Sequence, residues 1–213
     1  DEEFKHAIEL NPNNATAHHW YGHYLMTVGR MDESLTVARR GVEIDPLSSA
    51  MNAHLGWAYF YTRQYDRAIE QYRKVIGLDS NFRPAYSWLA RIYEQTGMDR
   101  QAVAAYQKAM SLSGESEVDV AAFAEAYAKG GIEGAYLWRL ERMQAEQEHP
   151  SAYLTAEIYA KLGNKDRALA WLERAYDENR EAGVSDLNIE PWFDSFRDDP
   201  RFQSLLRRLN FPE

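Results

Sequence analysis

Three histidines near the start of the chain come closest to a chemical site: His18, His19 and His23. His19 and His23 are four residues apart, so on a helix their imidazoles share one face and could bind a metal ion. The sequence fixes no third ligand, and it lacks the His-Glu-x-x-His arrangement of zinc proteases. We therefore interpret these side chains as lining a groove, with a metal site or a general base as the alternatives.

No other pattern predicts catalysis. The chain has no cysteine, which excludes thiol nucleophiles, thiolate metal sites and disulfides. No Gly-rich phosphate loop follows a strand, because the sequence shows no clear strand. The carboxylates of Asp198 and Asp199 directly precede Pro200, and helix capping explains them. We expect a protein that is not an enzyme and that needs no metal or other cofactor.

Charge is distributed unevenly along the chain, whose net charge is −9. Residues 1–114 carry 12 basic and 13 acidic side chains, a net of −1, whereas residues 115–213 carry 12 and 20, a net of −8. An acidic surface repels phosphate backbones and anionic lipids, so we expect neither nucleic acid nor a membrane as a partner. We expect a cytoplasmic protein, or a periplasmic one if an upstream membrane segment is fused to it.

A repeat of 34 residues determines which elements position these side chains. Small residues recur at this interval at Gly22, Gly56 and Ala90. A fixed period of this length indicates a solenoid, in which each unit buries its apolar face on the next. Three further sets keep the same interval: Leu25, Tyr59 and Tyr93; Ser34, Ala68 and Ala102; Ala38, Tyr72 and Tyr106.

The phase of the pattern resembles the tetratricopeptide repeat (TPR), a pair of antiparallel helices. The resemblance implies an all-α fold, an α-solenoid in which helix-turn-helix repeats form a right-handed superhelix. It also places Gly22, Gly56 and Ala90 where the two helices of a unit cross closely. One unit shows the pattern most fully, with Tyr86, Leu89, Ala90, Tyr93 and Gly97 followed by Ala102, Tyr106 and Ala109.

The register divides the chain into seven segments. The first is the second helix of a repeat whose first helix is missing, so we expect the chain to be cut from a longer protein. Its apolar Phe4, Ile8 and Leu10 would then attract a cover, which makes a homodimer through this N-terminal edge possible. The segments are 1–14; repeats at 15–48, 49–82 and 83–116; an irregular repeat at 117–148 that contains three glycines; a repeat at 149–180; and a C-terminal loop with a capping helix at 181–213.

In this family the first helices line a concave groove, so residues on their free side are the candidate contacts. Exposed aromatic residues in such a groove suit an extended peptide or a helix from a partner protein. The alternative is that Trp57, Phe60 and Tyr61 pack on the neighbouring repeat. The candidates are His19, His23, Met26, Trp57, Phe60, Tyr61, Arg91, Glu94, Gln95, Glu125, Lys129, Tyr153, Glu157 and Lys161.

Two narrower resemblances refine the expected function. TPR proteins that hold the acidic tails of heat-shock chaperones resemble one another in a Lys/Asn/Lys/Arg clamp. In this sequence the matching positions include His19, His23, Ala53 and Trp57, so we do not expect a chaperone tail as the ligand. The segments 160–163, 168–176 and 198–202 look like the TPR region of bacterial regulators that carry a winged-helix, cyclase or Ser/Thr kinase domain. We expect a protein-interaction module that binds a protein or peptide, as scaffold or sensory part of such a regulator; self-association is the alternative.

Overall fold

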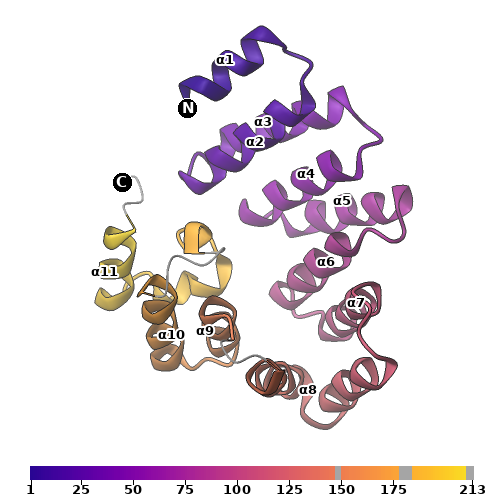
Figure 1. The fold of residues 1–213 in the computed structure, drawn as a ribbon, viewed down its shortest axis with the longest axis vertical. Coiled ribbons are helices and arrows are strands. Elements are labelled where there is room, and N and C mark those ends of the chain that lie inside the picture. Colours follow the sequence, from indigo (N-terminus) through magenta and orange to yellow (C-terminus); the bar gives the residue numbers. More distant parts are fainter. Residues whose placement is uncertain (147–149, 178–183, 210–213) are drawn as a thin grey trace. The chain divides into compact units, whose positions relative to one another are not determined.

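The computed structural model describes residues 1–146, 150–177 and 184–209, and every regular element in these ranges is a helix. The predicted all-α fold of helix-turn-helix repeats is confirmed (Figure 1). None of the described helices combines the length and the apolar character needed to cross a membrane. The elements are α1 (Glu2–Leu10), α2 (Ala15–Thr27), α3 (Met31–Ile44), α4 (Ser49–Tyr61), α5 (Tyr65–Leu78), α6 (Arg83–Gln95), α7 (Asp99–Leu112), α8 (Glu117–Glu146), α9 (Ala152–Lys161), α10 (Lys165–Asp177), η1 (Val184–Asp186), η2 (Pro191–Phe196) and α11 (Pro200–Arg208).

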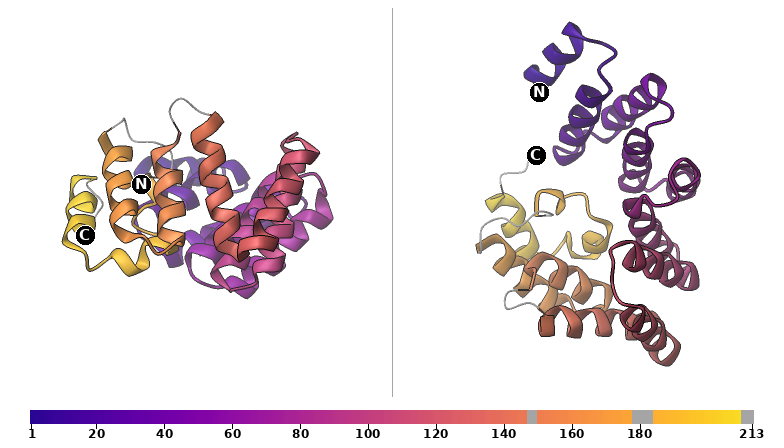
Figure 2. Two further views of the ribbon diagram at one scale, coloured as in Figure 1. Left: turned by 90° about the horizontal axis from the view of Figure 1, so that it is seen from below. Right: turned by 45° about the vertical axis from the view of Figure 1, so that its right-hand side comes forward.

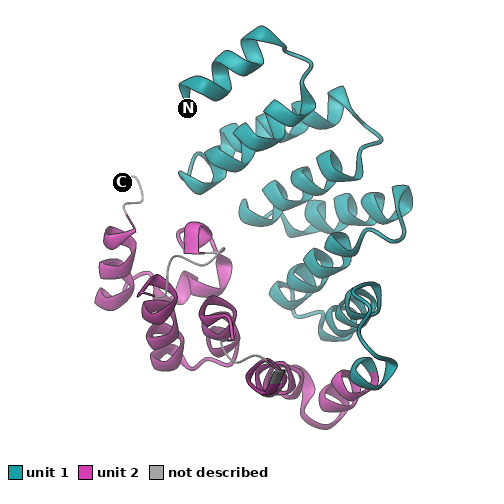
Figure 3. Cartoon of the chain, in the orientation of Figure 1, with its two compact units in different colours: residues 1–120 teal, residues 121–213 magenta. Residues whose placement is uncertain are grey.

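The chain forms two compact units, Asp1–Val120 and Ala121–Glu213 (Figure 3). In the first unit, helices pair in sequence as α2 with α3, α4 with α5, and α6 with α7. The first helices also contact one another, α2 with α4 and α4 with α6, so these three form one layer. We call α2, α4 and α6 the first-helix layer. The helix α1 packs on α2, where the ring of Phe4 stacks on Tyr21 at 5.8 Å between centroids.

The small residues of the repeat allow close packing, as predicted, but not always against the same partner. At Gly56, a Cβ atom would lie 2.8 Å from Cε2 of Tyr72 on α5, the second helix of the same pair. At Gly22, a Cβ atom would lie 2.5 Å from Cε1 of His54, which belongs to the first helix of the next pair. Gly22 also contacts its own second helix, because Ser34 Oγ donates a 2.7 Å hydrogen bond to the Gly22 carbonyl.

The turn between the two helices of a pair needs one residue with positive φ. Gly29 (φ 79°) and Gly97 (φ 68°) occupy this position, and 34 residues from each stands Arg63 with φ 60°. Glycine adopts this conformation without steric cost, whereas a side chain makes it less favourable. The second pair therefore closes its turn at a strained, non-glycine residue that the repeat pattern does not reveal.

The second unit begins with a helix that bends sharply. Gly131 in α8 has φ 62° and ψ −156°, and a Cβ atom at Gly134 would clash with the carbonyl oxygen of Ala126. The glycines therefore allow the chain to bend sharply within α8. Along the second half of α8, Tyr136 and Leu140 are buried, whereas Leu137 is exposed.

The C-terminal residues cover the last helix pair, as predicted of a cap. The helix α11 packs on α10, and η2 packs on α9; Figure 2 gives two further views of these helices. Phe202 and Leu205 of α11 are buried in one core with Phe193 and Phe196 of η2. Most of the loop expected before this cap falls on residues 178–183, which lie outside the described residues.

The close approach of α4 and α5 gives a testable prediction. Gly56→Ala should lower the free energy of unfolding by about 1–3 kcal/mol, because the new methyl group must displace the buried ring of Tyr72. Gly77→Ala is the matched control, since a Cβ atom there meets nothing within 4 Å. The control should leave stability unchanged or raise it by up to about 1 kcal/mol through helix propensity. Urea unfolding monitored by circular dichroism checks this prediction. Equal midpoints for the two variants would contradict this packing.

Candidate functional site

A row of aromatic rings and imidazoles crosses the first-helix layer from α2 to α6. The imidazole of His23 on α2 stacks on Trp57 of α4, with centroids 4.8 Å apart and an interplanar angle of 24°. The ring centroid of His19 lies 4.5 Å from that of His54 of α4, and the ring centroid of Trp57 lies 5.9 Å from that of Trp88 of α6. We call these five residues, His19, His23, His54, Trp57 and Trp88, the ring cluster. They connect three consecutive helix pairs.

The edge of the ring cluster carries a positive charge on α6. The guanidinium carbon of Arg91 lies 5.2 Å from the ring centroid of Trp88 and 6.0 Å from that of Phe60. A cation over an aromatic face is attracted by the ring quadrupole. The cluster therefore offers an apolar surface with a cation at its α6 end.

Several polar atoms of this surface have no hydrogen-bond partner among the described residues. Trp57 Nε1 and Gln95 Nε2 are covered from solvent and find no acceptor. His19 Nδ1 and His54 Nε2 are likewise covered and unpaired. An indole N–H can only donate, and the amide nitrogen of glutamine can only donate. Leaving a buried donor unsatisfied costs about 1–3 kcal/mol, so a ligand that displaces the covering side chains and supplies acceptors would gain hydrogen bonds here.

The imidazoles of the ring cluster are held in their neutral form. Burial, with smaller contributions from repulsion by His19 and His23, lowers the pKa of His54 to about 3. Burial also lowers the pKa of His19, to which His23 adds a smaller repulsion, and burial lowers the pKa of His23. A neutral imidazole could bind a metal, but the described residues contain no group of three metal-ligating side chains. The observed partners of these rings are other rings.

The structure places the remaining first-unit candidates at different depths. Phe60 and Tyr61 are 0% and 5% exposed, and both rings contact Trp88 of the next pair, at 5.3 and 6.0 Å. This is the arrangement of the alternative interpretation, in which they pack on the neighbouring repeat. Met26 is buried, and Glu94 is buried and accepts a 3.0 Å hydrogen bond from Tyr106 Oη. The half-buried candidates are His19, His23, Trp57, Arg91 and Gln95.

The five C-terminal candidates lie in the second unit. Glu125 and Lys129 are exposed and form an ion pair of 2.7 Å. Tyr153 is buried against Phe193, at 6.2 Å between centroids. The carboxylate of Glu157 and the ammonium of Lys161 form a 2.8 Å ion pair whose side chains are only 5% and 1% exposed.

The buried ammonium of Lys161 is enclosed by aromatic rings. Its Nζ lies 4.5 Å from the Trp192 ring centroid and 5.5 Å from that of Tyr136. Lys161 therefore joins α9 to α8 and η2. Within the second unit, the side chains of Tyr153, Glu157 and Lys161 are part of the interior.

Sequence reasoning missed His54 and Trp88, which complete the ring cluster. Both were detectable, because Trp20, His54 and Trp88 are spaced by 34 residues and occupy one position of the repeat. That position lies three residues before His23, Trp57 and Arg91, so it shares their helix face. Trp20 is the exposed member, with edge-on contacts to His19 at 5.2 Å and to His23 at 6.2 Å.

Comparison with known families identifies the repeats. Residues 54–117 match a family model described as the tetratricopeptide repeat, and residues 149–181 match another model of the same description. One matched segment lies in each of the two units. The predicted fold class, a TPR α-solenoid with a C-terminal capping helix, is confirmed.

Two curated proteins resemble part of the chain. Hsp70-Hsp90 organizing protein 1 of Glycine max is 30% identical over 94 residues, which are 44% of this chain and 16% of that protein. Small glutamine-rich tetratricopeptide repeat-containing protein 2 of Mycosarcoma maydis is also 30% identical over 94 residues, 44% of this chain and 27% of that protein. The match thus covers about a quarter or less of either relative.

Solved structures share the fold across most of the chain. TTC0263, a thermophilic TPR protein of Thermus thermophilus, has a TM-score of 0.59 at 19% identity and covers 91% of this chain and 99% of its own. The TPR protein YrrB has a TM-score of 0.52 at 19% identity. The match covers 87% of this chain and 96% of the YrrB chain. At this level of identity the likeness concerns the fold.

The neutral histidines predict how stability depends on pH. Because the folded state lowers their pKa below the ordinary value of 6.5, the unfolded chain binds more protons in acid. Stability should therefore fall as the pH drops from about 7 to 5.5, a window above the titration of ordinary carboxyl groups. His54→Gln should reduce this loss by about 1 kcal/mol at pH 5.5, since one pKa unit corresponds to about 1.4 kcal/mol.

Urea denaturation at pH 7.5, 6.5 and 5.5 checks this dependence. The matched control is His6→Gln, because His6 is exposed on α1 and lies outside the ring cluster. If the free energy of unfolding of His54→Gln depends on pH as that of the parent does, the imidazole of His54 is not held neutral.

Proposed function

We propose that the protein is an interaction module whose first-helix layer binds an extended peptide segment of a partner protein at the ring cluster. The unpaired donors Trp57 Nε1 and Gln95 Nε2 carry this proposal. They lie on neighbouring helices, with Trp57 on α4 within the ring cluster and Gln95 on α6 about two turns after Trp88. An extended peptide brings backbone carbonyl acceptors together with side chains that pack on aromatic faces, so it satisfies both features at once.

The relatives support this function at the level of the fold. YrrB is a TPR protein with an unusual peptide-binding site, and the Glycine max relative is an Hsp70-Hsp90 organizing protein. The surface in this chain differs from the chaperone clamp, because the clamp positions hold His23 and Trp57, whose rings stack on each other. We therefore propose a peptide with apolar and aromatic anchors for the ring cluster.

Resemblance of the last repeat and cap to the TPR region of bacterial regulators supports a narrower proposal. In such a protein this module would act as the scaffold or sensory part, and the partner peptide would be its signal. Self-association through α1 is a second candidate, favoured by Leu10, which is 74% exposed, and by the absence of any fully buried residue in this helix. Light scattering over a range of concentrations separates the two, since only self-association predicts a dimer without peptide.

The test begins with a random dodecapeptide library displayed on phage and selected on the purified chain. The critical variant is Trp57→Phe, which keeps a ring opposite His23 but removes the indole N–H. Its fold should be as stable as the parent, because the lost donor has no partner in the described residues. Affinity for a selected peptide should fall about threefold to tenfold, the net value of one hydrogen bond.

Trp171→Phe is the matched control, because Trp171 lies on α10 in the second unit beside Arg174. It should bind the selected peptide as the parent does, measured by isothermal titration calorimetry. Trp57→Ala is a less specific variant, since it also removes the contacts of Trp57 with His23 and Trp88. Equal affinities for Trp57→Phe, Trp171→Phe and the parent would refute binding at the ring cluster.

A further inference from the structure

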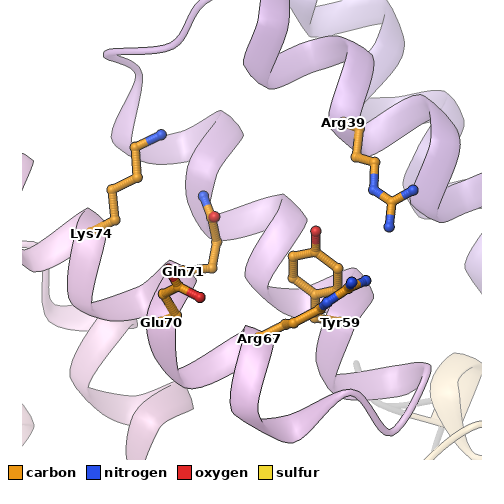
Figure 4. A pocket seen from close by; sticks show the side chains of 6 residues that line it. All are labelled: Arg39, Tyr59, Arg67, Glu70, Gln71 and Lys74. Atoms are coloured by element: carbon orange, nitrogen blue, oxygen red, sulfur yellow. The ribbon is translucent and has the colours of Figure 1, made fainter.

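A pocket, which we call the outer pocket, lies in the first unit where α3, α4 and α5 meet (Figure 4). It is open and has a volume of about 740 Å³, within the range of roughly 300–1,000 Å³ typical of ligand sites. Its lining comes from three helices. The residues are Arg39 of α3, Tyr59 of α4, and Arg67, Glu70, Gln71 and Lys74 of α5.

This outer pocket is separate from the ring cluster. Tyr59 follows Trp57 by two residues on α4, which is about 200° around a helix. The two side chains therefore lie on nearly opposite faces of α4. A ligand of one site does not cover the other.

The pocket is positively charged in an acidic protein. It contains three cations, Arg39, Arg67 and Lys74, and one anion, Glu70, so its local charge is +2, whereas the whole chain carries −9. The guanidinium carbons of Arg39 and Arg67 lie 5.9 and 5.8 Å from the ring centroid of Tyr59. Figure 4 shows Arg39 and Lys74 on opposite sides of the pocket.

The three cations are available to a ligand. None of them forms an ion pair with any residue that the structure describes, and Arg67 makes only a 2.9 Å hydrogen bond to the side-chain oxygen of Gln64. Other arginines of the same unit are neutralised: Arg40 pairs with Glu43 at 3.0 Å and Arg30 with Glu33 at 2.6 Å. The contrast is strongest between Arg39 and Arg40, which are adjacent in sequence.

One lining residue, Gln71, is held in place by hydrogen bonds through Asn52. Gln71 Nε2 donates to Asn52 Oδ1 at 2.7 Å, and Asn52 is fully buried. The amide of Asn52 in turn donates to the carbonyls of Pro46 and Ser48, at 3.0 and 2.9 Å. The side chain of Gln71 is therefore fixed beside the cations.

We propose that this outer pocket binds an acidic segment of a partner protein through its Asp or Glu carboxylates. Arginine donates two parallel hydrogen bonds to a carboxylate, and two arginines close to one ring, as Arg39 and Arg67 are to Tyr59, can hold neighbouring carboxylates. The chain would then contact partners on two faces, an apolar segment at the ring cluster and an acidic one at the outer pocket.

The probe for this site is a fluorescein-labelled hexaglutamate peptide, compared with hexaglutamine of the same length. Fluorescence polarisation with the full chain should show binding of hexaglutamate only, weakened when NaCl rises from 50 to 300 mM because salt screens exposed charges. Arg39→Gln and Arg67→Gln should each reduce the affinity about threefold to fivefold. Arg40→Gln, the matched control on α3, should change it by less than about 1.5-fold, because Glu43 already neutralises that charge.

Three outcomes would overturn the proposal: hexaglutamine binding as well as hexaglutamate, an equal loss of affinity for Arg40→Gln and Arg39→Gln, or binding of inorganic phosphate without any binding of hexaglutamate. The last would mean that the pocket takes small anions and not an acidic segment. Trp57→Phe should leave hexaglutamate binding unchanged, and Arg39→Gln should leave the peptide selected at the ring cluster unaffected. Failure at one site is thus distinguishable from failure at the other.

Discussion

Packing of rings between successive first helices is the interaction on which the first unit depends. A helix pair cannot bury its apolar face alone, so each pair is completed by the next. Here Trp88 of α6 completes the preceding pair. Its ring centroid lies 5.3 Å from that of Phe60 and 5.9 Å from that of Trp57, and its ring stacks on Tyr72 of α5 with an interplanar angle of 6°. Small residues make room for it, because Gly56 lets the Tyr72 ring lie directly against α4.

The same packing produces the candidate site. Rings that fill the space between helices also cover polar atoms, and at Trp57 and Gln95 the covered atoms are donors without acceptors among the described residues. The imidazoles between them remain neutral because burial disfavours the charged form. The ring packing therefore both stabilises the first-helix layer and creates the unpaired donors that a ligand could satisfy. The outer pocket, on the other side of α4, does not depend on this packing.

The sequence predicted the fold well because small and aromatic residues recur every 34 positions, as at the positions of Gly56 and Tyr72. It predicted the site less well. Repeat register shows which helix face a residue shares but not how deeply a neighbouring pair covers it, so Phe60 and Lys161 were expected as contacts although both side chains are buried. Arg63 at a position with φ 60° was likewise hidden, since glycine holds the equivalent place in the flanking pairs.

The central claim is that the indole N–H of Trp57 receives an acceptor when a partner peptide binds. The most direct measurement is the ¹⁵N–¹H correlation spectrum of the six tryptophan indoles, assigned by substitution, during titration with a peptide selected on the chain. The account predicts that the Trp57 indole proton shifts downfield and exchanges more slowly with solvent, while that of Trp171 stays in place. Saturating binding that leaves the Trp57 resonance unmoved would contradict it.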